Sequence, residues 1–306
     1  MRWVTYADAS GHDRAGVVND GAIHALEPGV TVLELLDSGD LTAAGERALG
    51  APSEIVALDA ATLRAPLQPR SIRDHVGFLQ HIRNCTGGDI APGYSQVPVF
   101  YFSNVAAVIG PHDEVAISPG CAQFDYELEV CAVIGRSGFN IARDDAEDHI
   151  AGYMMLCDWS ARDLQFKEMA MGLGPAKGKD GANTLGPMLV TADELESSRS
   201  NKGFDLSMTA HVNGELVSAG RWDSIDWDFA DMITYASRGT WLRPGDVIGS
   251  GTVPTGCLFE HFAMAPDSFR GWLQPGDGVS LEVEQLGVLR HRIVAGAVVE
   301  PLSTGY

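Results

Sequence analysis

Two carboxylates on one face of an apolar strand constrain this chain more than any other feature. In the run Phe124-Asp125-Tyr126-Glu127-Leu128-Glu129-Val130, Glu127 and Glu129 are two residues apart, so a strand points both to the same side. The apolar residues 130–134 that follow indicate a strand buried on both faces. Ionised carboxylates on a buried surface repel each other and lose hydration unless a cation lies between them. The pattern favours a hard divalent cation held by oxygen ligands over the alternative, an edge strand with a solvated acidic face.

The composition describes a globular protein and disfavours two classes of partner. The 306 residues suffice for a large core, and 45% hydrophobic and 20% charged residues are typical of soluble domains. The formal net charge of −20 disfavours nucleic acids and anionic membranes, because both bind basic surfaces. The five cysteines are scattered without a C-x-x-C pair, and no apolar leader opens the chain. We therefore expect reduced thiols and a cytoplasmic location.

A pair of prolines divides the chain into two expected domains. Residues 1–66 contain short strand-like and helix-like segments and predict a small N-terminal accessory domain. Pro66-Leu67-Gln68-Pro69 indicates the linker, because paired prolines stop regular structure. Residues 67–306 form the larger expected domain, in which strand-like segments outnumber helix-like ones. The order of these segments predicts an α+β fold, mostly β, with a mixed sheet and peripheral helices.

Residues 71–84 have the spacing of an amphipathic helix. Asp74, Phe78 and His81 occupy positions i, i+4 and i+7, which lie on one face of a helix. A segment at 85–97 that is rich in glycine, proline and small polar residues follows and is expected to be a loop. The helix would therefore present an acid and an imidazole on one side, next to a segment that can close as a lid.

A third carboxylate lies where a buried strand meets a helix predicted over residues 160–171. Asp158 ends the strand, and Ser160 is the expected N-cap of the helix. Arg162 and Gln165 are three residues apart and share a face of the first turns. Functional side chains often gather at such a strand end. The alternatives are a turn role for the aspartate and a solvated helix surface for the other two side chains.

Four motifs together resemble the fumarylacetoacetate hydrolase family. They are F-D-Y-E-L-E, C-D-W-S-A-R-D-L-Q, G-P-A-K-G-K-D and I-G-S-G-T-V-x-T-G, in the family's order and approximate spacing, and they cover most of the chain after Pro69. The resemblance implies that residues 67–306 are a catalytic domain with the mixed β-sheet roll or sandwich of the fumarylacetoacetase C-terminal type. It also implies a homodimer that acts on a small-molecule substrate.

The resemblance further implies a metal site and a catalytic set. In the family, matching carboxylates hold Mg²⁺, with Mn²⁺ or Ca²⁺ as alternatives, and here they are Glu127, Glu129, Asp158 and Asp74. The residues that match catalytic positions are His81 as general base, Glu260 as its orienting partner, and Lys179, Arg162 and Gln165 as donors to an oxyanion. The positions that match substrate contacts are Tyr101, Thr252, Gln165 and Lys179.

The reaction implied by the resemblance is hydrolysis of a carbon–carbon bond in a 1,3-dicarbonyl compound, such as an acylpyruvate or a diketo acid like fumarylacetoacetate. His81 would activate water, and the metal would stabilise the enolate that leaves. Where fumarylacetoacetases have two tyrosines and an arginine, this chain has Val76, Met169 and Ile90. Contacts to a substrate carboxylate are therefore missing or come from another residue, of which Arg83 is a candidate. We expect a different acylpyruvate or a more apolar diketone.

Two other functions stay open at this point. The first is decarboxylation, hydration or tautomerisation of a 2-oxo acid on the same scaffold, because these reactions also use a metal-stabilised enolate. The pair of His81 and Glu260 favours hydrolysis, since a decarboxylase need not activate water. The second is a metal-dependent binding module without turnover, which predicts tight ligand binding and no effect of His81 on a rate.

Overall fold

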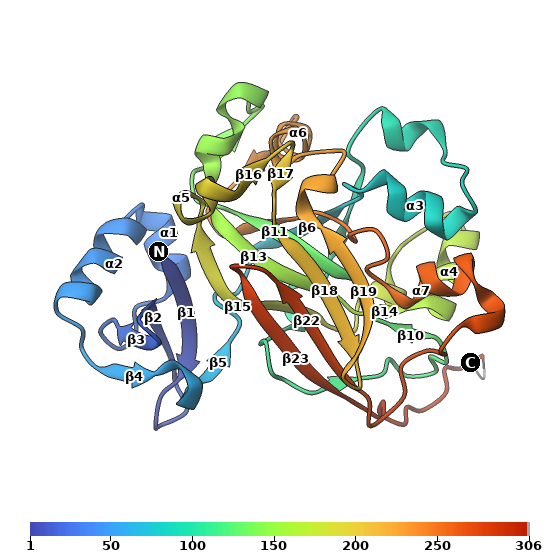
Figure 1. Cartoon of the computed structure of the whole chain (residues 1–306), viewed down its shortest axis with the longest axis horizontal. Coiled ribbons are helices and arrows are strands. Elements are labelled where there is room, and N and C mark those ends of the chain that lie inside the picture. The colour runs from blue at the N-terminus through green and yellow to red at the C-terminus, as the bar shows by residue number, and fades with distance from the viewer. Residues whose placement is uncertain (305–306) are drawn as a thin grey trace.

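The computed structural model describes residues 1–304 and has a twelve-stranded mixed sheet at its centre (Figure 1). The strands, in order across the sheet, are β4 (Ile55–Ala57), β3 (Ala22–Ala25), β2 (Asp13–Asn19), β1 (Arg2–Ala7), β15 (Asn183–Thr191), β13 (Ile150–Asp158), β11 (Leu128–Ile134), β21 (Asp246–Gly249), β6 (Ser71–His75) and β7 (Phe100–Ser103). Two further strands pair at its side, β5 (Thr62–Arg64) with β1 and β8 (Val108–Ile109) with β15. The sheet is mixed because β21 runs parallel to β6 and β8 runs parallel to β15.

A second sheet packs against the middle of the first. Its order is β19 (Glu215–Arg221), β18 (Ser207–Val212), β22 (Gly278–Val283), β23 (Gly287–Val294) and β9 (Val115–Ala116). One continuous core joins Val130 and Met155 of the first sheet to Met208 and Leu281 of the second. Side chains in β18 and β22 alternate between buried and accessible, as expected when one face covers a core. The predicted fold class, mostly β with mixed sheets and peripheral helices, is confirmed.

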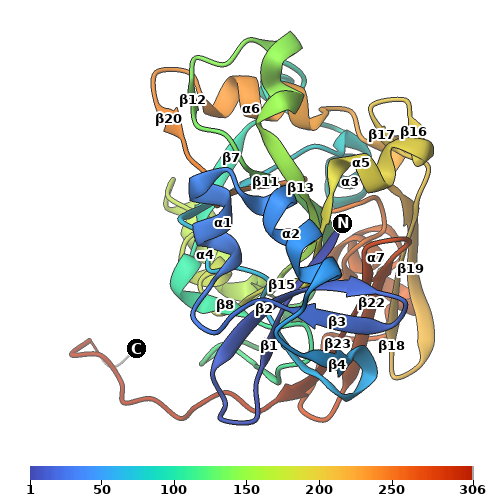
Figure 2. The same cartoon turned by 90° about the vertical axis from the view of Figure 1, so that its left-hand side faces the viewer.

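Helices lie around these sheets. They are α1 (Val32–Ser38), α2 (Leu41–Gly50), α3 (Leu79–Thr86), α4 (Arg162–Ala170), α5 (Ala192–Leu195), α6 (Phe229–Ala236) and α7 (Leu258–Met264). Figure 1 shows α1 and α2 at one end of the molecule and α3, α4 and α7 at the other. Figure 2 shows α1 and α2 beside the N-terminal strands. The two ends of the molecule are therefore built from different parts of the chain.

Shorter elements complete the described chain. Three two-stranded sheets pair β10 (Phe124–Asp125) with β14 (Ser160–Ala161), β12 (Gly138–Phe139) with β20 (Trp241–Leu242), and β16 (Arg199–Ser200) with β17 (Gly203–Phe204). The 3₁₀ helices are η1 (Leu58–Ala60), η2 (Pro92–Ser95), η3 (Val105–Ala107), η4 (Arg143–His149), η5 (Lys177–Lys179), η6 (Glu196–Ser198), η7 (Trp222–Ser224) and η8 (Pro266–Ser268). Of these, β10, β14 and η5 bring polar residues to the site described below.

The N-terminal strands extend the central sheet. β1 pairs with β15, where Trp3 lies opposite Leu189, and it also pairs with β2 and β5. Helix α1 begins with a capping box in which Thr31 and Glu34 exchange hydrogen bonds with the backbone. Trp3 and Leu189 share one buried cluster with apolar residues of α1 and α2. The division into two domains at residue 66 stays a prediction.

The predicted helix over residues 71–84 is wrong in its first half. That half is strand β6, which pairs with β21 on one side and β7 on the other, and only α3 is helical. The strand ends at His75. Two residues later the Gly77 N–H donates to the Ser250 carbonyl at 2.8 Å, and a Cβ at this glycine would lie 2.4 Å from the same oxygen. Pairing along both edges outweighs the helical spacing. Asp74 therefore lies on a strand and His81 on a helix.

The helix predicted over residues 160–171 begins later than expected. Ser160 and Ala161 form strand β14, and α4 begins at Arg162 without a hydrogen bond from a side-chain cap. The predicted N-cap role of Ser160 is therefore wrong. Its hydroxyl instead accepts a hydrogen bond of 2.7 Å from the ammonium group of Lys179. Ser160 thus holds the ammonium group of Lys179 in the site and does not start the helix.

Trp222 occupies the centre of an aromatic cluster, and replacing it with alanine is expected to lower the free energy of unfolding by about 3–5 kcal/mol. Its side chain is fully buried, and its ring centroid lies 4.8 Å from that of Phe204, 5.2 Å from that of Tyr153 and 6.1 Å from that of Phe229. Trp241, which is 55% exposed, is the matched control and should cost less than about 1 kcal/mol. Urea denaturation measures both variants. Equal losses would contradict this description of the core.

Candidate active site

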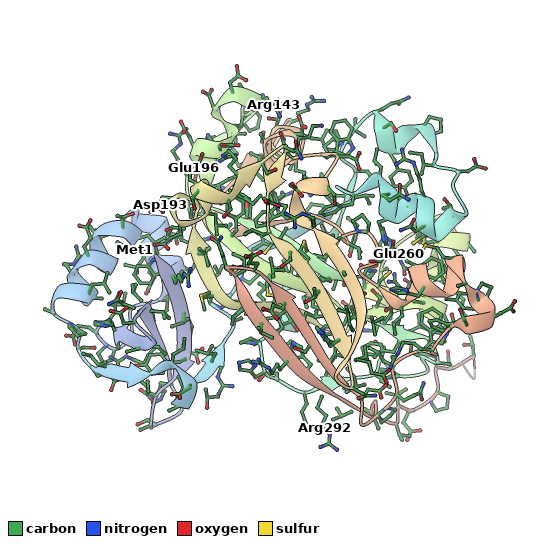
Figure 3. All side chains as sticks on the ribbon, viewed as in Figure 1. Met1, Arg143, Asp193, Glu196, Glu260 and Arg292 are labelled. Carbon is green, nitrogen blue, oxygen red and sulfur yellow. The ribbon has the colours of Figure 1, made fainter. Side chains whose placement is uncertain are left out.

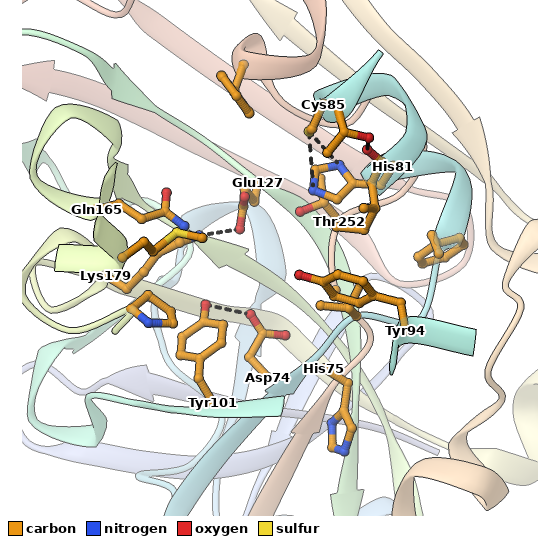
Figure 4. A pocket seen from close by; sticks show the side chains of 18 of the residues that line it. Asp74, His75, His81, Cys85, Tyr94, Tyr101, Glu127, Gln165, Lys179 and Thr252 are labelled. Carbon is orange, nitrogen blue, oxygen red and sulfur yellow. Dashed lines mark hydrogen bonds and ion pairs between the residues drawn. The ribbon is translucent and has the colours of Figure 1, made fainter. Parts of the chain in front are cut away.

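Polar side chains gather at one edge of the central sheet, around a cavity of about 480 Å³ (Figure 4). β13, β11, β21, β6 and β7 are neighbours in the sheet, and their residues at this edge reach the cavity or lie next to it. The residues predicted from the sequence that line the cavity are Asp74, His81, Tyr101, Glu127, Glu129, Arg162, Gln165, Lys179 and Thr252. The other two lie directly behind, Glu260 against His81 and Asp158 against Lys179. The structure thus brings the predicted site residues together.

A glycine makes room for the acids between neighbouring strands. β21 lies between β11 and β6, where Gly249 pairs with Cys131 on one side and Asp74 on the other. A Cβ at Gly249 would lie 2.3 Å from Oδ1 of Asp74, so only glycine leaves this carboxyl its place. Ligand oxygens of Asp74, Glu127 and Glu129 lie within 4.8 Å of one another. The strands on either side of β21 therefore bring Asp74 and Glu129 to one point, and Glu127 lies directly before β11.

Asp158 joins these acids through Tyr101 and Lys179. The Tyr101 hydroxyl lies 2.9 Å from Asp74 and is also hydrogen-bonded to Asp158. The ammonium group of Lys179 donates three hydrogen bonds, to Glu127 at 2.5 Å, to Asp158 at 2.6 Å and to Ser160 at 2.7 Å. In Figure 4, Lys179 and Tyr101 lie on one side of the cavity and His81 on the other. The four carboxylates (Asp74, Glu127, Glu129 and Asp158) are called the acidic cluster below.

Burial raises the pKa of three of the four carboxyl groups in the acidic cluster. Desolvation, followed by repulsion from neighbouring acids, raises the pKa of Glu129 well above its ordinary value. Desolvation also raises the pKa of Asp74, and it raises that of Asp158 to about 7 although a nearby ammonium group opposes the shift. At Glu127, burial alone would raise the pKa, but the neighbouring ammonium and guanidinium groups outweigh it and lower the pKa. Any proton that these carboxyls retain would be displaced when a cation binds.

Three buried oxygens of the acidic cluster have no hydrogen-bond partner in the described protein. They are Oδ1 of Asp74, Oε2 of Glu129 and Oδ1 of Asp158. Most buried acceptors in proteins are hydrogen-bonded, so three unpaired ones at a single place call for a ligand. Hard divalent cations bind carboxylate oxygens. The donor set therefore fits a divalent cation, and the assignment of the four residues as its ligands stays a prediction.

His81 reaches the same cavity from α3 and is held by Glu260 of α7, on the side of the molecule where these helices lie (Figure 3). Its Nδ1 lies 2.8 Å from Oε1 of Glu260, a side chain without exposed surface. Asn84 and the Thr255 N–H donate to the other oxygen of this carboxylate, at 2.6 and 2.8 Å. Burial alone would lower the pKa of His81, but contacts with Cys257 and Glu260 raise it to about 10. The pair therefore holds a proton at the edge of the cavity.

Sequence reasoning missed Asp125, which fixes Arg162. The Nε and Nη2 atoms of Arg162 donate to Oδ2 of Asp125 at 2.9 and 2.8 Å, and Asp125 also accepts the Leu258 N–H. The Nη1 atom lies 2.8 Å from Glu127 and 3.1 Å from Gln165. The guanidinium thus positions these two side chains, and its contact with an oxyanion stays a prediction. The signal was in the sequence, because Asp125 precedes Glu127 by two residues and shares its side of the strand.

The rest of the cavity wall is mainly apolar. Val76 and Met169, two of the positions that depart from the fumarylacetoacetase pattern, line it. Arg162 is the one arginine among the described residues that line the cavity, so the suggestion that Arg83 supplies a carboxylate contact finds no support. The other apolar or aromatic lining side chains include Phe78, Ile82, Tyr94, Phe166 and Phe259.

Most of the chain matches the model of a known protein family. The family model described as "Fumarylacetoacetate (FAA) hydrolase C-terminal" matches residues 70–294. The chain belongs to this family. The resemblance seen in the four motifs is thereby confirmed, and the match contains every residue of the acidic cluster as well as His81 and Glu260.

Proteins that are similar to this chain are named after different enzyme activities. The chain is 30% identical over 282 residues to the oxaloacetate tautomerase FAHD2A, mitochondrial, of Homo sapiens, covering 91% of this chain and 84% of the relative. A probable 2-hydroxyhepta-2,4-diene-1,7-dioate isomerase from Mycobacterium abscessus has a TM-score of 0.74 and 26% identity, over 97% of this chain and 100% of the other. Maleylpyruvate hydrolase from Sphingobium sp. SYK-6, solved with manganese(II) and pyruvate, has a TM-score of 0.72 and 25% identity over the same shares.

These names describe enzymes of two reaction classes, isomerisation (which includes tautomerisation) and hydrolysis, so family membership alone does not decide the reaction of this chain. They share the scaffold, and one of them binds a divalent ion together with a 2-oxo acid. In residues 1–304, no helix is long and apolar enough to cross a membrane.

Proposed function

We propose that this protein is a divalent-metal-dependent hydrolase that cleaves a carbon–carbon bond in a 1,3-dicarbonyl compound. The observation that carries the proposal is the pair of His81 and Glu260, 2.8 Å apart, at the cavity that also contains the acidic cluster. A histidine oriented by a buried carboxylate is suited to activating water, which is the second substrate of a hydrolase. The proposed substrate is an acylpyruvate or a related diketo acid, and the proposed class is a hydrolase of carbon–carbon bonds in ketonic substances.

Mg²⁺ is the proposed cofactor, with Mn²⁺ or Ca²⁺ as substitutes, and Glu127, Glu129, Asp158 and Asp74 are its proposed ligands. The three unpaired carboxylate oxygens support this assignment, as does the manganese(II) in the related maleylpyruvate hydrolase. When bound, such an ion supplies Lewis-acid polarisation of substrate oxygens.

The protein's own residues account for the proton transfers. His81 takes a proton from water, and Glu260 stabilises the imidazolium that forms. The hydroxide attacks the carbonyl carbon, and the oxygen that gains charge lies within reach of donors proposed to be Lys179, Arg162 and Gln165. The bond between this carbon and the carbon that lies between the two carbonyl groups then breaks, leaving a carboxylic acid. The electron pair stays on the departing carbon, which regains the proton from His81. Tyr101 and Thr252 are proposed to contact the substrate.

The apolar wall predicts a preference for substrates with an apolar acyl group. Each buried methylene contributes about 0.8 kcal/mol, so lengthening the acyl chain by one carbon should raise kcat/KM roughly fourfold until the cavity is full. Met169→Arg should lower kcat/KM for these substrates at least tenfold and raise it for acyl groups that end in a carboxylate. Met171, which is 71% exposed and does not line the cavity, gives the matched control Met171→Arg. A wild-type enzyme that prefers the carboxylated substrates would contradict this prediction.

Tautomerisation of oxaloacetate or another 2-oxo acid is the second candidate function. The 30% identity with a human oxaloacetate tautomerase favours it. Tautomerisation moves a proton between carbon and oxygen and breaks no carbon–carbon bond, whereas hydrolysis consumes water and yields an additional carboxylic acid. The two reactions therefore differ in their products.

The deciding experiment incubates the purified protein with a series of acylpyruvates and 1,3-diketones and follows the loss of enol absorbance. It is run with Mg²⁺, with Mn²⁺ and with a chelator, and the products are identified by chromatography. Hydrolysis predicts metal-dependent formation of two carbonyl products, one of them a carboxylic acid. Metal-dependent equilibration of the enol and keto forms of oxaloacetate, without cleavage of any diketone, would favour the second candidate. Release of CO₂ from oxaloacetate would favour decarboxylation.

The homodimer and the cytoplasmic location stay proposals that rest on the family resemblance and the composition. Light scattering coupled to size-exclusion chromatography measures the first, and a dimer predicts twice the chain mass of 32.6 kDa. The names of several relatives include the word mitochondrial, which describes those proteins.

A further inference from the structure

Two cysteines flank the His81–Glu260 pair, and the mechanism above uses neither. Cys85 follows His81 by one turn of α3, and its Sγ lies 3.8 Å from Nε2 and 4.0 Å from Nδ1 of the imidazole. Cys257 directly precedes α7, and its Sγ lies 3.7 Å from Oε1 of Glu260. Figure 4 shows Cys85 beside His81. Two facing segments therefore each contribute one cysteine and one further donor.

The donor atoms of three of these residues converge on one point, and Cys85 adjoins them at the imidazole of His81. Single ligand atoms of His81, Cys257 and Glu260 all lie within 4.8 Å of one another. Cys257 and Glu260 have no exposed surface, whereas His81 and Cys85 line the cavity. The cluster is thus closed at the back and open toward the cavity, so a small ion can enter from the side on which substrate binds.

The chemistry of this donor set differs from that of the acidic cluster. Two sulfurs, one imidazole nitrogen and one carboxylate oxygen are the ligand types of a tetrahedral zinc site, and soft thiolates select thiophilic cations. The acidic cluster offers only hard oxygen ligands, which suit Mg²⁺ or Mn²⁺. Asn84 and the Thr255 N–H hold the second oxygen of Glu260 at 2.6 and 2.8 Å, which is the outer support that metal ligands in proteins usually have.

We propose that His81, Cys85, Cys257 and Glu260 form a second metal site, which binds a thiophilic divalent cation such as Zn²⁺ or Cd²⁺. Binding displaces the proton shared by His81 and Glu260 and the protons of both thiols. A cation at this site occupies the imidazole and removes it from proton transfer. Zn²⁺ therefore inhibits the enzyme while Mg²⁺ still occupies the acidic cluster. The binding itself is independent of the proposed function, and only the inhibition rests on it.

The test titrates Cd²⁺ into the full-length protein in the presence of saturating Mg²⁺ and records the thiolate-to-cadmium charge-transfer absorbance together with the heat of binding. We expect one Cd²⁺ per chain with a charge-transfer band. Cys85→Ser and Cys257→Ser should each weaken binding at least tenfold and reduce the band. Cys121→Ser removes a half-buried thiol outside the cluster and should change neither. Cys85 is only partly buried, so its variant remains informative even if Cys257→Ser fails to fold.

A band that persists unchanged in the Cys85 and Cys257 variants, or the absence of a band in the wild type, would overturn the proposal. Loss of Cd²⁺ binding in Glu129→Gln would also overturn it, because the ion would then belong to the acidic cluster. If the protein hydrolyses no diketone, the Cd²⁺ titration still decides whether the site exists. If it does hydrolyse one, addition of Zn²⁺ should abolish at least nine-tenths of the rate in the wild type, and the rate of Cys85→Ser should resist the same Zn²⁺ concentration.

Discussion

Replacing His81 by asparagine is expected to lower kcat/KM for carbon–carbon cleavage by about 10²–10⁴-fold, the usual contribution of a general base. Among residues 1–304, His81 is the one histidine whose side chain lies both in the cavity and against a buried carboxylate, with Nδ1 2.8 Å from Glu260. Asparagine is close in shape and keeps a donor near this oxygen, so the fold should tolerate it. The measurement is the initial rate with the best acylpyruvate of the substrate series at saturating Mg²⁺.

Two further variants make the result of His81→Asn specific. Glu260→Gln keeps the side-chain shape but cannot stabilise the imidazolium, and it should lose about 10²-fold or more in kcat with a smaller change in KM. His211→Asn changes a half-buried histidine of β18, in the other sheet, and should leave the rate unchanged. A His81→Asn enzyme with more than a tenth of the wild-type rate would show that water is activated elsewhere.

Glu129→Gln is expected to change stability in opposite directions with and without a divalent ion. A carboxyl whose pKa is raised on folding reduces stability at every pH above its ordinary pKa, and the pKa of Glu129 is raised well above that value. In the presence of chelator at pH 7–8, glutamine removes this cost, so the variant should be more stable than the wild type by about 1–3 kcal/mol. Adding Mg²⁺ or Mn²⁺ should reverse the order. At 100 times its dissociation constant an ion stabilises the wild type by about 2.7 kcal/mol, and the variant has lost a ligand.

Thermal unfolding of the wild type and of Glu129→Gln, with chelator and with Mn²⁺, measures this reversal in the order of their stabilities. Glu282→Gln, an exposed glutamate on β22, is the control and should follow the wild type under both conditions. A Glu129→Gln variant that is less stable than the wild type in chelator would contradict the description of Glu129 as a buried acid that lacks a compensating charge. A variant that gains as much stability from Mn²⁺ as the wild type would remove Glu129 from the ligand set.

The sequence predicted that the acidic side chains face one common site, because this orientation depends on the local spacing of residues along a strand. Glu127 and Glu129 reach the same cavity although the strand is interrupted between β10 and β11, and Asp158 lies at the end of β13, where the change from strand to helix placed it. These positions follow from alternation and from the order of short motifs. Neighbouring strands of a single sheet then bring them together.

Features that depend on pairing between distant segments were not predictable in the same way. Asp74 and His81 have helical spacing, but β21 and β7 pair with both edges of residues 71–75, and this long-range pairing makes the segment a strand. The spacing of Asp125 and Glu127 indicates the side of the strand on which Asp125 lies, but its partner Arg162 is 37 residues away and is set by the fold. The approach of Cys257 and Glu260 to His81 likewise depends on how α7 packs beside α3, which no single-segment pattern contains.

The acidic cluster is expected to bind one divalent ion beside the His81 imidazole. Anomalous diffraction from a crystal grown with Mn²⁺ can show this binding, because the signal locates the ion without reference to any activity. We expect one strong peak between the carboxylate oxygens of Asp74, Glu127, Glu129 and Asp158. No peak there, at a Mn²⁺ concentration that stabilises the protein, or a peak elsewhere in the molecule, would contradict it.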